Sequence, residues 1–179
     1  MGTATVRTFL AYLEDKPGVL NRVTSLFRRR AFNIESLTVG RTERPDVSRM
    51  TLVVRADDDD ARRLEAHLWK LENVLEVEEV SHAPSIIREL ALVKVRAPAD
   101  VRAAVMQICE VFRARVVDVT PDVLSIEITG APDKVDGLLE MVRAYGVVEM
   151  VRTGSVAMRR GLDSETVNTL RPGVSPAAA

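Results

Sequence analysis

The stretch that decides the fold is RTFLAYLEDKPGVLNRVTSLF, residues 7–27. Its first seven residues are rich in aromatic and apolar side chains and predict a β-strand. A turn signal follows at residues 14–18, where Pro17 precedes Gly18. Apolar residues then recur at helical spacing, which predicts a helix with one face toward a core; they are Val19, Leu20, Val23, Leu26 and Phe27.

The rest of the first half completes a small domain. Two strands are predicted at residues 33–42 and 47–56, a helix follows the aspartates at 57–60, and a last strand spans 74–81. Those aspartates lie where the second helix begins, and acidic side chains there cap the helix and offset its positive end. The arginines at 28–30 lie at the opposite, negative end of the first helix, so both charge runs have a structural interpretation.

The same order of elements recurs from residue 89. Strands are predicted at 89–97, 115–120, 123–129 and 147–153, and helices at 101–112 and 133–144. The fold class is therefore α+β, with two tandem ferredoxin-like βαββαβ domains at residues 1–82 and 83–161. Residues 162–179, which contain two prolines and end in three alanines, are predicted to be a disordered tail. A helix-backed sheet leaves one face without a cover, so we expect homodimerisation through the first domain.

Composition narrows the classes of function. Apolar residues make up 46% of the chain and charged residues 28%, with a net charge of −1. This balance gives no electrostatic footprint for nucleic acid or an anionic membrane, and we expect neither as a partner. The single cysteine favours a cytoplasmic protein, and residues 1–7 lack the pattern of a signal peptide.

Few residues are arranged for catalysis. His67 and His82 have no second histidine or cysteine at a spacing that would bind zinc. Cys109 lies beside the apolar stripe of a predicted helix, as expected of a packed thiol. Phosphate loops and dinucleotide fingerprints are absent from the sequence. We therefore predict no catalytic residues and no metal ligands, and interpret the chain as a binding protein.

The segment at residues 13–20 favours one kind of ligand. Gly18 has no Cβ, so a ligand can approach the backbone closely, and the first amides of the helix that follows lack intrahelical partners. These amides suit a carboxylate such as that of a free amino acid, whose amino group could be accepted by Asp15 and Asn33. The alternative is that Pro17 and Gly18 form only a turn and Asp15 only a cap. The residues alone leave both interpretations open.

Several segments resemble one family in its own order. They are DKPGVL at 15–20, NIESLTVG at 33–40, SRMT at 48–51, RELALVKV at 88–95, VDVTP at 117–121 and RTGS at 152–155. Together they are similar to the regulatory small subunits of acetolactate synthase, whose first domain is an ACT domain. The resemblance covers residues 7–161.

The resemblance implies a chain that is not an enzyme and has no cofactor of its own. It implies a partner, the large catalytic subunit, which carries thiamine diphosphate, magnesium and usually FAD. This chain would activate that subunit and confer feedback inhibition by valine in branched-chain amino acid biosynthesis. Valine would bind between two ACT domains, and the contacts carried over by position are Asp15, Gly18, Val19, Leu20, Asn33 and Ile34. Some relatives have Asn in place of Asp15.

Three alternatives differ in what they require. A free-standing ACT-domain sensor, acting on another enzyme or on transcription, shares the segment at 15–20 but does not require the match in the second half. An RNA-recognition module shares the βαββαβ order, and it requires exposed aromatic residues on its central strands. The first strand carries Phe9 and Tyr12, whereas the strand at 47–56 carries no aromatic residue. An enzyme would require a catalytic constellation.

Overall fold

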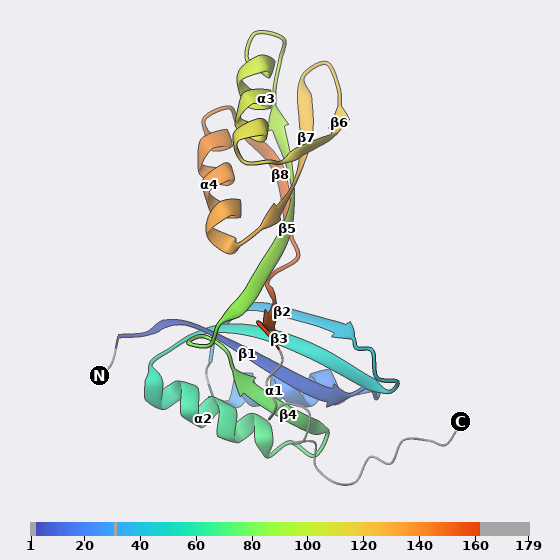
Figure 1. The fold of residues 1–179 in the computed structure, drawn as a ribbon, viewed down its shortest axis with the longest axis vertical. Coiled ribbons are helices and arrows are strands. Elements are labelled where there is room, and N and C mark those ends of the chain that lie inside the picture. The colour runs from blue at the N-terminus through green and yellow to red at the C-terminus, as the bar shows by residue number, and fades with distance from the viewer. Residues whose placement is uncertain (1–2, 31, 162–179) are drawn as a thin grey trace. The chain divides into compact units, whose positions relative to one another are not determined.

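The computed structural model describes residues 3–30 and 32–161 and divides into two compact units (Figure 1). The first unit contains the chain up to Ile86 and the described residues from Ala157 onward, and the second contains Ile87–Val156. The sequence placed residues 83–161 in one domain, whereas the segment from Ala157 contacts the first unit. The predicted disordered tail at 162–179 lies outside the described residues.

The first unit is a four-stranded antiparallel sheet with two helices on one face. Its strands have the order β2-β3-β1-β4, the arrangement of a ferredoxin-like fold. This confirms the predicted fold class for the first half. The elements are β1 (Thr5–Glu14), α1 (Val19–Arg30), β2 (Ile34–Arg41), β3 (Val47–Ala56), α2 (Asp58–Trp69) and β4 (Val74–Glu79).

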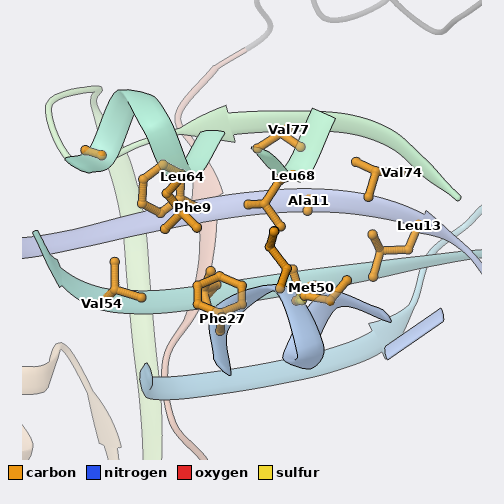
Figure 2. Close-up of a cluster of buried hydrophobic side chains, with 14 of the residues drawn as sticks. Phe9, Ala11, Leu13, Phe27, Met50, Val54, Leu64, Leu68, Val74 and Val77 are labelled. Carbon is orange, nitrogen blue, oxygen red and sulfur yellow. The ribbon is translucent and has the colours of Figure 1, made fainter. Parts of the chain in front are cut away.

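Alternation along the strands builds the first core. Successive side chains of a strand point to opposite faces, so every second residue of β1 and β3 faces the helices. Figure 2 shows Phe9 of β1, Leu64 of α2 and Phe27 of α1 in this one cluster of buried side chains. The buried cluster includes Phe9, Ala11, Leu13, Val23, Phe27, Met50, Leu52, Val54, Leu64, Leu68 and Val77.

The second unit repeats the plan with its own core. Its sheet has the order β6-β7-β5-β8, and β9 pairs with β5. The side chains of Leu92 and Val151, opposite each other on neighbouring strands, are exposed on the face away from the helices. The elements are β5 (Ser85–Arg96), α3 (Arg102–Val111), β6 (Arg115–Val119), β7 (Val123–Gly130), α4 (Pro132–Arg143) and β8 (Val147–Arg152). The short strand β9 (Val156–Arg159) follows, and from Ala157 onward it belongs to the first unit.

The two helices of the first unit begin differently. At α2, the Asp57 carboxylate accepts a hydrogen bond from the Asp60 backbone N–H at 2.9 Å, and three aspartates occupy the first turn. These acidic groups offset the positive end of α2, as the sequence predicted. The first turn of α1 carries no acidic residue, whereas its last turn carries three arginines.

The sheet face of the first unit that points away from the helices was expected to be uncovered, but part of it is covered. Leu10 and Val53 point away from the helices, yet both are buried. Ala157 of β9 lies on this face, where its carbonyl oxygen accepts a hydrogen bond from Arg49 at 2.7 Å and its N–H lies 3.4 Å from the Thr51 hydroxyl. The prediction of an uncovered face was therefore wrong for the first unit, because the chain returns to that face after β8.

None of the helices in the described ranges, residues 3–30 and 32–161, is long and apolar enough to cross a membrane.

Candidate functional site

The candidate effector site begins in the loop between β1 and α1. Gly18 has a φ of +86°, a conformation that residues with a side chain rarely adopt. Setting aside its chain neighbours, no described atom lies within 4 Å of a Cβ built at Gly18. The glycine is thus required by its backbone conformation and leaves open space in front of the helix.

The amides at the start of α1 face this space. The first hydrogen bond of the helix is donated by the Arg22 N–H to the Gly18 carbonyl at 3.1 Å. The amides that precede Arg22 in the helix have no intrahelical acceptor and carry partial positive charge. Because the first turn of α1 has no acidic side chain, this charge is not offset as it is in α2. The start of α1 is therefore suited to a carboxylate ligand.

The predicted contact residues differ in what they can offer a ligand. The side chain of Asp15 is exposed, and its backbone N–H donates to the Asp46 carbonyl at 2.8 Å, which fixes the loop against the β2–β3 turn. Val19 is only 6% exposed, so its side chain is not open to a ligand, and its N–H donates to the Lys16 carbonyl at 3.4 Å. Leu20 is 43% exposed and can contact an apolar ligand side chain.

The two remaining predicted residues lie at the other end of the sheet. Glu14, next to the loop, is opposite Val47 on β3, whereas Ile34 is opposite Val54. These β3 residues are seven positions apart, or roughly 23 Å at the usual rise of a strand. One chain therefore brings Asp15, Gly18, Val19 and Leu20 together but not Asn33 and Ile34.

A polar cluster next to the loop has no motif in the sequence that would predict it. The Glu14 carboxylate accepts hydrogen bonds from the Asn73 amide at 2.6 Å and pairs with Lys16 at 3.0 Å. The Asn73 side-chain oxygen accepts a hydrogen bond from Arg22 at 2.7 Å. These contacts, first that of Asn73 and then that of Lys16, hold the pKa of Glu14 below its ordinary value of 4.5. The only sequence signal is an asparagine in the turn before a predicted strand.

The cysteine and histidine side chains that could take part in other chemistry are held by packing or by charged neighbours. Cys109 is buried in the core of the second unit, and burial raises the pKa of its thiol. His82 lies against Arg7, which also pairs with Asp58 and Glu79. Within residues 3–30 and 32–161, no group of three or more histidine, cysteine or acidic side chains could hold a metal ion.

The aromatic residues of β1 do not form a base-stacking surface. Phe9 and Tyr12 are three residues apart, so they point to opposite faces of the sheet. Phe9 is buried in the core, and the Tyr12 ring packs against the guanidinium groups of Arg44 and Arg49, 5.0 and 5.5 Å from its centroid. This arrangement argues against the RNA-recognition alternative, which requires both rings on one exposed face.

Comparisons with known proteins match both halves of the chain. The family model described as "AHAS small subunit-like ACT domain" matches residues 10–76, and the one described as "Small subunit of acetolactate synthase" matches residues 88–161. A probable acetolactate synthase small subunit from Archaeoglobus fulgidus is 49% identical over 154 residues, which are 86% of this chain and 96% of that protein. The acetolactate synthase small subunit of Mycolicibacterium smegmatis is 48% identical over 160 residues, 89% of this chain and 94% of that protein.

A solved structure agrees with these matches. The crystal structure of the acetolactate synthase small subunit from Thermotoga maritima is similar with a TM-score of 0.81 and 37% identity. The similarity covers 89% of this chain and 99% of that one. The match in the second half, residues 88–161, is the feature that a free-standing ACT-domain sensor does not require.

Proposed function

Because this chain belongs to the family of acetolactate synthase small subunits, and is thus a regulatory subunit, we propose that it activates a catalytic large subunit and makes it sensitive to valine. The large subunit would carry thiamine diphosphate, magnesium and FAD, and this chain would carry no cofactor. The single cysteine, buried and unpaired, is compatible with our further proposal of a cytoplasmic location.

The observation that carries the proposal is the start of α1. A free amino acid has a carboxylate, and the amides around Gly18 offer an open, positive helix end without an acidic side chain nearby in the first turn. The exposed Asp15 carboxylate can accept the ammonium group, and the exposed Leu20 can contact an aliphatic side chain such as that of valine.

A second copy of the chain would complete the site. β2 lies at an edge of its sheet, and pairing with the partner's β2 about a two-fold axis makes the two strands antiparallel. The start of one β2 then lies beside the end of the other, near Arg41. Because Arg41 and Glu14 lie at the same end of the sheet, opposite Ser48 and Val47, the partner's Asn33 and Ile34 would approach the loop at Gly18.

Inhibition requires that valine bind one arrangement of the assembly more tightly than another. Valine held across the seam between two ACT domains would favour one geometry of that seam. A coupling free energy of about 1–3 kcal/mol is typical of such effects. The result would be a change in how this chain contacts and activates the catalytic subunit.

We expect this chain to stimulate acetolactate production by its cognate large subunit, and valine to reverse the stimulation. The measurement is the rate of acetolactate formation with the large subunit alone and with increasing amounts of this chain, while valine is titrated. Alanine, which has a carboxylate and an ammonium group but a smaller side chain, is the control effector. An unchanged rate and no response to valine would contradict the proposed function.

We also expect the chain to be a dimer that depends on the β2 edge. Val39 lies on β2 and is 41% exposed, and lysine at this position would place two like charges in the seam. Light scattering should give twice the mass of one chain for the wild type and a lower mass for Val39→Lys. Val148→Lys, which changes an exposed valine of β8 in the second unit, is the matched control and should stay dimeric. A wild-type monomer at all concentrations would exclude the dimer.

A further inference from the structure

Asn73 forms hydrogen bonds at both ends of the loop at Asp15–Gly18. At the β1 end, the Asn73 carbonyl accepts a hydrogen bond from the Glu14 N–H at 3.0 Å, and its side-chain amide donates to the Glu14 carboxylate at 2.6 Å. At the α1 end, its side-chain oxygen accepts a hydrogen bond from Arg22 at 2.7 Å. Arg22 in turn donates its backbone N–H to the Gly18 carbonyl.

This arrangement fixes the position of one loop end relative to the other. Four residues separate β1 from α1, and they include a glycine in the left-handed region. Pro17 restricts one φ of this segment, whereas Gly18 gives it freedom, and holding the segment between two fixed points reduces that freedom. The exposed Asp15 and the amides after Gly18 lie at the two ends of this segment. The link through Asn73 therefore holds their separation together with the hydrogen bond from Asp15 to Asp46.

We propose that Asn73 is a positioning residue for the effector, setting the distance between the groups that hold the two ends of an α-amino acid. The inference rests on the proposed function of the loop as an amino-acid site. Asn73 does not contact the ligand itself; it acts through Glu14 and Arg22. The Arg22 side chain is 58% exposed, so its contacts with Asn73 and Glu72 add little net stability. The consequence of losing them should appear in ligand affinity.

The amide of Asn73 is required because it donates on one side and accepts on the other. Replacement by alanine removes both contacts and should weaken valine binding about 10-fold. Asn73→Asp keeps the acceptor for Arg22 but places a carboxylate against that of Glu14, and should weaken binding to a similar extent. Adding Glu14→Gln restores a donor facing Asp at position 73 with the roles reversed. The double variant Glu14→Gln/Asn73→Asp should therefore bind valine within about 3-fold of the wild type.

The titration of Glu14 gives a second readout that a general loss of stability would not move. In the wild type, the contact with Asn73 is the first cause of the lowered pKa of the Glu14 carboxyl, so Asn73→Ala should raise this pKa toward 4.5. A lowered pKa in the folded state means that the contact stabilises the protein above pH 4.5, and that this contribution is lost as the pH falls through the lowered pKa. The pKa of Glu14 is measured from the NMR chemical shift of its side-chain carboxyl carbon as the pH is varied.

The experiment is calorimetric titration of the full chain with L-valine. The control is Glu149→Ala, which removes the exposed ion pair between Lys94 and Glu149, joined at 2.6 Å in the second unit, and should leave valine affinity unchanged. Melting temperatures of all variants should stay within about 4 °C of the wild type. Wild-type affinity in Asn73→Ala, or no rescue in the double variant, would overturn this inference alone. No binding of valine by the wild type would overturn it together with the proposed function.

Discussion

Replacing Gly18 by Asp should abolish the response to valine while leaving the chain folded. Aspartate tolerates the left-handed region better than most residues, and the space in front of Gly18 accepts a side chain. A carboxylate at this position would interact favourably with the start of α1, where no acidic side chain offsets the helix dipole. The same carboxylate would occupy the place of the ligand's carboxylate and repel it.

The expected effect is a rise of about 100-fold or more in the valine concentration that inhibits the reconstituted enzyme, since two like charges at contact distance cost several kcal/mol. Stimulation of the large subunit without valine should remain. The measurement combines valine titration of acetolactate formation with calorimetry on the isolated chain.

Two controls separate charge from backbone strain. Gly18→Asn has nearly the same shape and the same tolerance of positive φ but no charge, and should lose clearly less valine affinity than Gly18→Asp. Gly161→Asp places the same side chain at another glycine with φ +77° and open space, and should leave the valine response intact. Full valine sensitivity in Gly18→Asp would remove the start of α1 from the effector site.

The sequence predicted the regular elements well because each signal is local. The apolar pattern at residues 7–13 predicts most of β1, and the pattern after Gly18 predicts α1 from its first residue. Because the βαββαβ order of elements recurs in the second half, the fold class could be predicted without knowledge of any tertiary contact. The sequence did not predict β9, because this strand is only four residues long. Its Ala157 is held by hydrogen bonds to Arg49 and Thr51, which lie more than 100 positions earlier in the chain.

The candidate site was predictable only in part. The helix start at Gly18 follows from the chemistry of a glycine that opens a helix, and its neighbours follow in sequence. The position of Asn33 does not, because β1 and β2 run parallel to each other, so the end of β1 and the start of β2 lie at opposite ends of the sheet. The link between Glu14 and Asn73 joins residues 59 positions apart, and a single asparagine in a turn does not reveal which carboxylate it contacts.

Replacing Phe9 by Ala should destabilise the first unit by about 3–5 kcal/mol, a large part of the stability of a small domain. Phe9 is fully buried at the centre of the sheet and packs in the same layer as Leu64 and Leu68 of α2 (Figure 2). Alanine would leave a cavity that the strands around it cannot close, because β1 pairs with β3 on one side and β4 on the other.

Trp69 makes this effect measurable in the first unit alone. It is the only tryptophan of the chain, and it lies at the end of α2, packed against the same core. Urea unfolding followed by its fluorescence, at one fixed protein concentration, should show a lower midpoint for Phe9→Ala with an unchanged slope. Val6→Ala is the matched control, because Val6 lies on the same strand but is half exposed, and it should cost about 1 kcal/mol or less. Equal costs for the two variants would mean that burial on the helix side of β1 does not hold this domain together.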